Sequence, residues 1–454
     1  MDIKIAEEFM LKLIAEAGKY GFEECEASYS DDISMSIDIL KGEVSSYEQS
    51  SEQSVSFRGL KNGQMGYCET SRFDDDAVRF MLESASENCD VLNDEDREFI
   101  YCDENNKNLH FSQMSDAYDK NTYNRFAELG LDLEKSILAL DPRIIAVDYL
   151  SISCARGPAL IINSKGLHSY RDMDGLSLFA GCRAKDEDGS IKSGGHYWVG
   201  NDIDKFDKEA FLAKLSDNIL GKMGASSCKS GTYKTVFTNE AFMQFMTAFL
   251  NNTFATVMQK GLSLLDGRVG EKIASDCLTI KDVPMYEDAL TKIPFDDEGV
   301  LTTEKAIIDK GVFATPFYNL KSAYKAGTVS TGNGFKSGST IGTSPTNLLV
   351  VPGDKSFDEL CAEAGEGIIL TDLSGLHAGV NTISGDFSLL CEGYLIENGK
   401  KGRPVEQITA AGNFYEIIKN VISVGNDIIN IPAGQGEFFT PSVLVSEVNI
   451  SGES

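Results

Sequence analysis

Basic residues are scarce in this 454-residue chain, which has 41 Lys and Arg against 70 Asp and Glu and a formal net charge of −29. A surface with this charge balance repels the phosphate backbone of nucleic acids unless its few cations cluster strongly. The sequence contains no such cluster of cations. We therefore expect no direct DNA binding, and we interpret the acidic surplus as favouring solubility.

Long apolar runs are also absent, because no stretch reaches 18 apolar residues. This excludes a recognisable transmembrane helix. The first residues have neither the basic region nor the apolar region of a signal peptide. The ten cysteines lack C-x-x-C spacing, which is typical of reduced thiols and not of a disulfide framework or a zinc knuckle. These features predict a cytoplasmic protein with no membrane contact.

Histidine is the third scarcity, with four in the whole chain. None occurs between His196 and His377, and no cysteine follows Cys391. The stretch between these two histidines therefore lacks imidazole groups, and the tail after Cys391 lacks thiolate groups, the two kinds of ligand that zinc prefers. His377 has Asp386 and Ser388 nearby in sequence, which raises the possibility of a Ser-His-Asp triad, but no G-x-S-x-G elbow accompanies it. We favour a structural or peptide-contacting role for His377.

The remaining composition is that of a globular protein, with 42% hydrophobic and 24% charged residues, and its length allows two domains. We place an N-terminal α+β domain at 1–222 and a β-rich C-terminal domain at 223–454. Helical periodicity and alternating strands suggest that the N-terminal domain contains the order helix, strands, helix twice. Such a duplication would let two half-covered sheets bury their apolar faces together. The helices are expected at 3–20, 74–87, 122–140 and 205–220, with a surface connection at 90–118.

The C-terminal domain is expected to be mainly antiparallel sheet with few helices. A helical stretch covers 239–260, and shorter helices are predicted at 357–364 and 415–421. Glycines crowd the segment 371–427, where short β-prone runs between them predict a tightly turned meander. Its Asn398-Gly399 pair predicts a type I′ hairpin turn. The fold class is therefore α+β.

Two polar segments of the C-terminal half have a functional and a plain interpretation. The acidic run 296–298 could bind a hard cation through oxygen ligands, but such runs are more often solvated turns. The segment 332–339 is rich in glycine and serine but lacks the frame of a phosphate-binding loop, so we expect a flexible loop. Asn413, before the helix predicted at 415, is expected to cap it.

Several motifs of this half occur in an order that resembles a known family. They are GLHAGVN at 375–381, SGDFSL at 384–389, EGYLIENGK at 392–400, PVEQITAAGN at 404–413 and VGND at 424–427, preceded by DDEG at 296–299 and TGNG at 331–334. Together they resemble the C-terminal signature of the TldD/TldE (PmbA) family. These metallopeptidase-related proteins are also named modulators of DNA gyrase.

The resemblance implies a zinc site that this chain lacks. In the catalytic branch of the family, a helix carries H-E-x-x-x-H, in which the histidines bind zinc and the glutamate acts as base. An ungapped match to SLLDGRVG at 263–270 places Met246, Thr247 and Asn251 at the first His, the Glu and the second His. The resemblance therefore implies a chain of the TldE/PmbA branch, with no catalytic residue and no metal of its own.

Such a chain is expected to pair with a zinc-bearing TldD-like subunit in a heterodimeric peptidase that acts on small or unfolded peptides. The partner would hold the zinc. In this chain the glycine-rich sheet would hold an extended peptide by backbone hydrogen bonds, and the residues expected to bind substrate are His377, Gly379, Asn381, Gly385 and Asp386. Two alternatives remain open. One is a self-sufficient peptidase with a rearranged site, and the other is a peptide-binding homodimer without peptidase activity.

Overall fold

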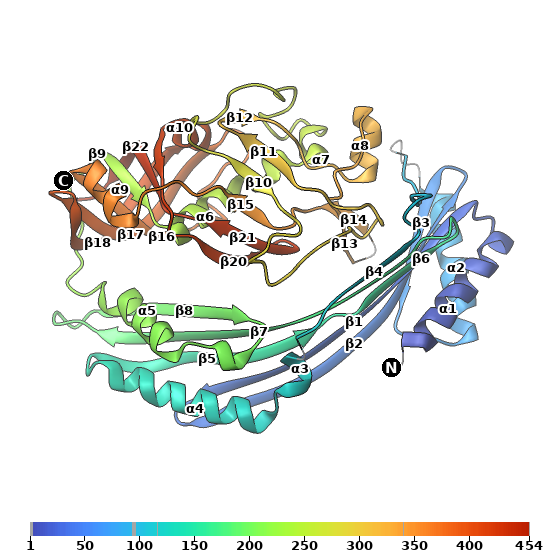
Figure 1. The fold of residues 1–454 in the computed structure, drawn as a ribbon, viewed down its shortest axis with the longest axis horizontal. Coiled ribbons are helices and arrows are strands. Elements are labelled where there is room, and N and C mark those ends of the chain that lie inside the picture. The colour runs from blue at the N-terminus through green and yellow to red at the C-terminus, as the bar shows by residue number, and fades with distance from the viewer. Residues whose placement is uncertain (1–2, 93–96, 116, 339, 454) are drawn as a thin grey trace. The chain divides into compact units, whose positions relative to one another are not determined.

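A computed structural model describes residues 3–92, 97–115, 117–338 and 340–453. The chain forms two compact units, which are described separately. Unit 1 comprises Met1–Gly221 together with two segments from far along the sequence, Phe295–Leu301 and Gly334–Gly342. Unit 2 comprises the rest, from Lys222 onward. The fold class is α+β, as predicted from the sequence (Figure 1).

Unit 1 is built on one sheet, for which eight strands are described. Its main path runs β3-β2-β1-β5-β7-β4, while β6 pairs with β1 and β7, and β8 pairs with β7. The strands are β1 Glu24–Leu40, β2 Glu43–Lys61, β3 Gln64–Thr70, β4 Asn108–Gln113, β5 Ile144–Arg156, β6 Ala159–Asn163, β7 His168–Lys185 and β8 Ile191–Gly200. The two helix, strands, helix repeats therefore share a single sheet, and the expectation of two facing sheets is wrong. The segment predicted as a connection at 90–118 also supplies a strand, β4, which pairs in parallel with β7.

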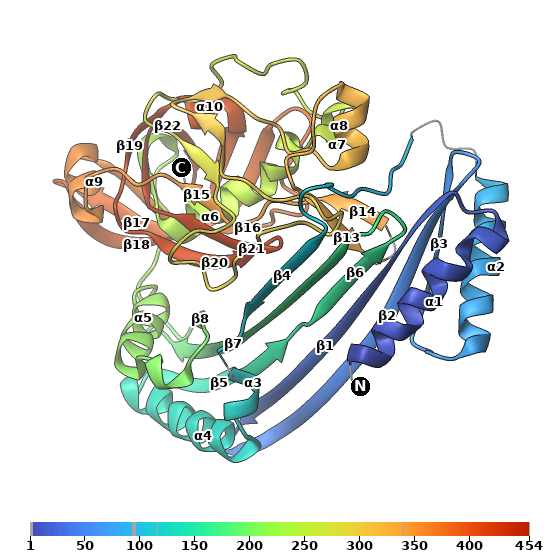
Figure 2. The same cartoon turned by 45° about the vertical axis from the view of Figure 1, so that its right-hand side comes forward.

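Helices cover the apolar face of this sheet. They are α1 Ile3–Glu16, α2 Asp75–Val91, α3 Ala117–Lys120, α4 Tyr123–Leu140 and α5 Lys208–Leu220, with 3-10 turns at Ala17–Tyr20 and Ile203–Lys205. Asp74 starts α2 by accepting a hydrogen bond from the backbone N–H of Ala77 at 2.8 Å. Helices α1 and α2 lie against β1 and β2 (Figure 2), and their buried side chains form one apolar cluster with those of the strands. Side chains alternate along a strand, so the β1 residues next to those of this cluster point away from the helices.

Unit 2 contains two sheets. One has the order β12-β11-β10-β15-β21-β20, and the other has the order β18-β17-β16-β9-β22-β19 with β18 also paired to β22. The strands are β9 Gly231–Phe237, β10 Ile280–Asp282, β11 Lys305–Asp309, β12 Val312–Phe313, β15 Leu348–Val350, β16 Gly367–Ser374, β17 Asp386–Glu397, β18 Lys400–Asn413, β19 Val421–Val424, β20 Ile429–Ala433, β21 Gly436–Thr440 and β22 Val443–Ser451. The helices are α6 Asn239–Phe249, α7 Ala255–Met258, α8 Leu320–Ala326, α9 Phe357–Ala364 and α10 Phe414–Lys419, with a 3-10 turn at Leu250–Thr253.

The glycine-dense meander is present as β16, β17 and β18 in antiparallel order. Asn398 and Gly399 both have positive φ, at 53° and 74°, so the type I′ turn between β17 and β18 is confirmed. Asn413 caps α10 as predicted, because its side chain accepts from the Tyr415 N–H at 3.1 Å.

Two local predictions are wrong. The acidic run of Asp296, Asp297 and Glu298 is not a solvated turn, because all three side chains are buried in unit 1. The segment 332–339, predicted as a flexible loop, contains strand β13 Gly334–Ser337, which pairs with β14 Thr340–Thr343, while its last residue lies outside the described residues. Among the described residues, no helix is long and apolar enough to cross a membrane.

Candidate functional site

Helix α6 and the 3-10 turn that follows it carry the positions that the family signature assigns to the zinc site. Met246 is 7% exposed and belongs to the core of unit 2, whereas Thr247 and Asn251 are exposed. The Thr247 hydroxyl hydrogen-bonds the sulfur of Met243 at 3.3 Å. A core thioether, a hydroxyl and a carboxamide are poor substitutes for two imidazoles and a carboxylate base. The three side chains therefore do not fit a zinc site.

No other metal centre emerges nearby. Within the part of the chain that the structure describes, no three His, Cys, Asp or Glu side chains gather closely enough to hold a metal ion. The buried face of α6 is aromatic, and Phe249 stacks on Phe414 with ring centroids 4.3 Å apart. Phe245 contacts both Phe387 and Phe414. This face of the helix packs the core of unit 2.

The loop between β16 and β17 contains the predicted substrate-binding residues. His377 and Asn381 are exposed in it, and Asp386 is exposed at the start of β17, whereas Gly385 is buried. No hydrogen bond or ion pair joins the His377 ring to another described residue. The Ser-His-Asp arrangement considered from the sequence therefore has no contact that would activate a serine.

Asn381 and Asp386 hold the shape of this loop. The Asn381 carboxamide oxygen accepts from the N–H groups of Ile383 and Ser384, each at 3.1 Å. The Asp386 carboxylate accepts from the Ser384 hydroxyl at 2.8 Å and from Asn413 Nδ2 at 2.9 Å. Both hydrogen bonds lower the pKa of Asp386, and the bond from Asn413 has the larger effect.

The two glycines of the loop are required by geometry. A side chain at Gly379 would lie 2.3 Å from the Ser388 carbonyl oxygen, and Gly385 has a φ of +83° beside the Tyr415 ring. The backbone groups of both glycines bond within the unit, because Gly379 N–H donates to Gly375 O and Gly385 O accepts from Phe414 N–H. These groups are therefore already used and are not free to pair with a peptide.

Asn252 connects this loop to the helix, and sequence reasoning missed it. It is 1% exposed, and its Nδ2 donates to Thr382 O at 2.9 Å and to the Tyr415 hydroxyl at 3.2 Å. Its Oδ1 has no hydrogen-bond partner among the described residues. The sequence signal was an Asn-Asn pair inside the predicted amphipathic helix.

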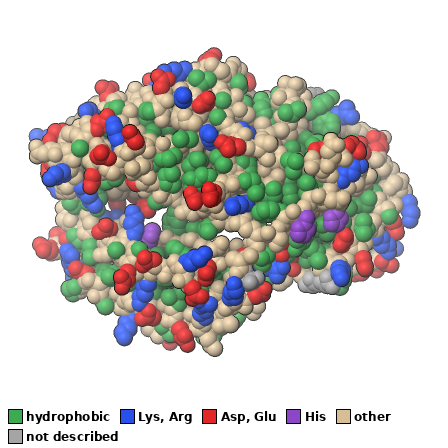
Figure 3. All heavy atoms as spheres, viewed as in Figure 1, with side chains coloured by type: hydrophobic (Ala, Val, Ile, Leu, Met, Phe, Trp, Pro, Cys, Tyr) green, Lys and Arg blue, Asp and Glu red, His purple; other side chains and the backbone are tan. Residues whose placement is uncertain are grey.

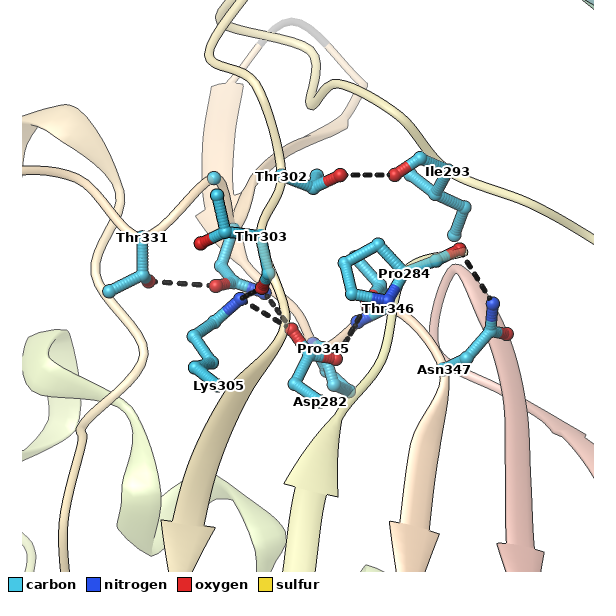
Figure 4. Close-up of polar contacts among 12 residues, drawn as sticks. Asp282, Pro284, Ile293, Thr302, Thr303, Lys305, Thr331, Pro345, Thr346 and Asn347 are labelled. Carbon is cyan, nitrogen blue, oxygen red and sulfur yellow. Dashed lines mark hydrogen bonds and ion pairs between the residues drawn. The ribbon is translucent and has the colours of Figure 1, made fainter. Parts of the chain in front are cut away.

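The motif TGNG has a structural role in unit 2. The Asp282 carboxylate, fully buried, accepts from Thr346 N–H at 2.8 Å and from Asn333 Nδ2 at 3.2 Å, and Lys305 lies 2.7 Å away (Figure 4). The Thr331 hydroxyl in turn donates to Asn333 Oδ1 at 2.7 Å. This network is satisfied internally, and it ties the ends of β10, β11 and β15 to the TGNG segment.

The motif DDEG has its role in unit 1. The Asp296 carboxylate accepts backbone N–H groups from Glu298, Val300 and Gly334 at 2.8–3.0 Å. Burial, and next the Glu298 carboxylate, raise the pKa of Asp296 well above its usual value. Asp297 accepts from Arg171 Nη2 at 2.7 Å. The motif therefore joins two distant segments of sequence inside one unit.

Comparison with known proteins agrees with these motifs. Residues 230–452 match the PmbA/TldA metallopeptidase C-terminal domain, 25–89 match domain 1 and 117–223 match the central domain. The metalloprotease PmbA homolog of Haemophilus influenzae is 24% identical over 99% of this chain and 96% of its own. The metalloprotease PmbA of Escherichia coli O157:H7 is 29% identical over 72% of this chain and 69% of its own.

Solved structures show the same fold. A Thermotoga maritima protein described as a modulator of a DNA gyrase is 31% identical, with a TM-score of 0.85 over 98% of this chain and 100% of its own. TldE from Thermococcus kodakarensis has a TM-score of 0.86 at 20% identity, covering 98% of this chain and 100% of its own. The domain matches together span nearly the full length, and the DDEG and TGNG motifs each make contacts within a single unit. The chain belongs to the PmbA/TldD metallopeptidase family.

Proposed function

We propose that this chain is the non-catalytic, TldE/PmbA-type subunit of a two-chain zinc peptidase that acts on small or unfolded peptides. One observation carries the proposal: Met246 and Thr247 of α6 and Asn251 of the following 3-10 turn stand where a zinc-binding helix needs two histidines and a glutamate. Without imidazole ligands there is no bound water of lowered pKa to attack a peptide bond. The zinc would belong to a TldD-like partner.

In this proposal the chain contributes to the holding of the substrate. The exposed side chains His377, Asn381 and Asp386 would contact the peptide, while Gly379 and Gly385 let the loop adopt its shape. The backbone of the two glycines is already paired, so we assign the contact to side chains and not to backbone pairing. The ten unpaired cysteines favour a reducing cytoplasmic location.

The test uses this chain alone and mixed with a family member that carries H-E-x-x-x-H. Alone, the chain is expected to hold no stoichiometric zinc by elemental analysis and to leave an unfolded casein-type peptide intact. The mixture is expected to form a heterodimer in light scattering and to cleave the peptide in a chelator-sensitive way. Chelator-sensitive cleavage by this chain alone would refute the proposal.

A variant separates the alternatives. His377→Ala in the mixture is expected to raise KM for the peptide and to leave the zinc content unchanged, and His110→Ala in β4 of unit 1 serves as the matched control. Cleavage by the isolated chain that disappears in His377→Ala would establish a self-sufficient peptidase. A homodimer that persists when the zinc-bearing relative is added, with no cleavage, would establish a peptide-binding homodimer.

A further inference from the structure

The face of the unit 1 sheet that points away from α1 and α2 contains a polar groove. Along β1, Ala27 and Tyr29 are buried on the helix side, so Ser28 and Ser30 alternate onto the opposite face. A cavity of about 680 Å³ opens over this second face. Its floor carries the hydroxyls of two cross-strand pairs on β1 and β2, Ser28 with Ser56 and Ser30 with Ser54. We call it the serine groove, and β1, β2, β6 and β7 run side by side beneath it (Figure 2).

Cations line one side of the serine groove. Lys336 of β13 donates from Nζ to the Ser28 hydroxyl and lies 3.7 Å from Glu26 Oε1. Arg171 of β7 donates to Asp297 at 2.7 Å. Both side chains line the cavity, and each has more donor hydrogens than these contacts use.

A buried ion pair of Arg58 with Glu26 lies beside the floor of the groove. Arg58 lies opposite Glu26 in the β1–β2 ladder, beside the Ser28–Ser56 pair. It is 3% exposed, its Nε donates to Glu26 at 2.9 Å, and its Nη2 has no hydrogen-bond partner among the described residues. Arg58 does not line the cavity, so the donors that an incoming carboxylate could reach at this end are those of Lys336 and Arg171.

Carboxylates line the other side. Asp32 and Glu52 stand directly opposite each other on β1 and β2 at the end away from Ser28, while Glu69 of β3 lies across from Ser56 and is level with Ser28. All three are exposed, and none forms an ion pair with another described residue. Like charges directly opposite in neighbouring strands are destabilising. A bound cation between Asp32 and Glu52 would relieve that repulsion.

The separation of the two ends selects the size of the ligand. Asp32 lies four residues from Ser28 on β1, which corresponds to about 13 Å along the strand. An extended peptide spans about 3.3–3.6 Å per residue, so three or four residues bridge the distance. The serine hydroxyls between the ends can donate to, and accept from, a peptide backbone.

We propose that the serine groove binds a free peptide of three or four residues, with its carboxylate near Lys336 and Arg171 and its ammonium group between Asp32 and Glu52. The inference rests on the proposed function, since peptides of this size with two free termini are products of peptidases. It assigns a product-binding site to the chain that does not cut.

The test is calorimetric titration of the full chain, alone, with trialanine and tetraalanine. At least one of them is expected to bind, and N-acetylation or C-amidation is expected to weaken binding by about tenfold or more, the loss of a charge-assisted hydrogen bond. Binding that is unchanged by either modification would overturn the proposal, as would the absence of binding at millimolar peptide.

Variants at exposed positions locate the site without risk to folding. Glu52→Gln is expected to weaken binding of the free peptide by about tenfold. The free peptide should then bind this variant no more tightly than the N-acetylated peptide does. Glu48→Gln, four residues away on the same face of β2 and outside the groove, is the matched control and should bind as the parent chain does. Equal binding by both variants would place the peptide elsewhere and contradict the assignment.

The titration needs neither zinc nor a partner, so its outcome is independent of the test of the proposed function. A chain that cleaves peptides alone would refute the non-catalytic subunit while leaving the groove intact. A chain that pairs and supports cleavage, but shows no response to blocked termini, would refute the groove alone.

Discussion

His196 is a half-buried histidine of β8 that packs on the ring of Phe211, with centroids 5.0 Å apart. Burial lowers the pKa of His196 to about 4, and the positive charge of Lys214 adds to the effect. The neutral ring is therefore the form that the folded unit accommodates. The ordinary pKa of 6.5 applies to the unfolded chain.

This difference predicts an acid-sensitive contribution to stability. The contribution of His196 is fully present above pH 6.5 and is lost as the pH falls towards 4, because the unfolded chain takes up the proton first. In His196→Gln, the melting temperature of unit 1 should fall less between pH 7 and pH 4.5 than in the parent chain. Thermal unfolding followed by circular dichroism measures this, with His110→Gln as control. Parallel curves for parent and His196→Gln would contradict the prediction.

At the scale of single residues, a feature can be predicted from the sequence when it is caused by residues that are adjacent in the chain. The turn at Asn398-Gly399 and the cap at Asn413 follow from the chemistry of adjacent residues, and both are confirmed. The burial of Asp296 and Glu298 was missed, because it depends on backbone donors at Gly334 and on Arg58, far away in sequence. A run of acids in sequence does not reveal partners of that kind.

At the scale of elements, the helical stretch predicted at 239–260 is divided into α6, a 3-10 turn and α7. The apolar periodicity continues through the break, which is therefore not predicted from the spacing of apolar residues. The Thr253 hydroxyl donates to Leu250 O at 2.6 Å, and Asn252 turns inward to the loop before β17. Tertiary contacts therefore outweigh helix propensity at this point.

Because of this break in the helix, substitution of two adjacent asparagines by alanine should affect stability differently. Asn252→Ala removes the donor to Thr382 O and the Tyr415 hydroxyl, and should lower the free energy of unfolding by about 1–2 kcal/mol. Hydrogen exchange at amides 380–386 should accelerate, because the loop loses its tie to the helix. Asn251→Ala is the control, since its exposed side chain should change stability by less than about 0.5 kcal/mol. Equal exchange in the two variants would show that the tie is unimportant.

At the scale of the whole molecule, composition and motif order were sufficient for the fold class and the family. They did not reveal that the two helix, strands, helix repeats share one sheet, or that Phe295–Leu301 and Gly334–Gly342 belong to unit 1. Strand order and the pairing of distant segments depend on contacts that periodicity along the chain does not encode. The serine groove escaped notice for the same reason, because its lining comes from separate strands and from both of these segments.

The net charge of −29 leads to a prediction about nucleic acids, which matters because a related structure is described as a modulator of a DNA gyrase. On the face drawn in Figure 3, Lys and Arg side chains are scattered among Asp and Glu. Several cations are also occupied in ion pairs, such as Arg183 with Asp148 at 2.6 Å. Phosphate binding needs cations that are free to replace the counterions of DNA.

The protein should therefore leave a duplex of about 30 base pairs unshifted in a gel mobility assay, even at 20 mM salt, where electrostatic attraction is screened least. A lysine-rich peptide has the opposite charge to DNA, so it should bind the protein weakly and dissociate as the salt concentration is raised. Retention of the duplex at micromolar protein, with an affinity that falls as salt rises, would reveal a cationic surface that the charge balance conceals.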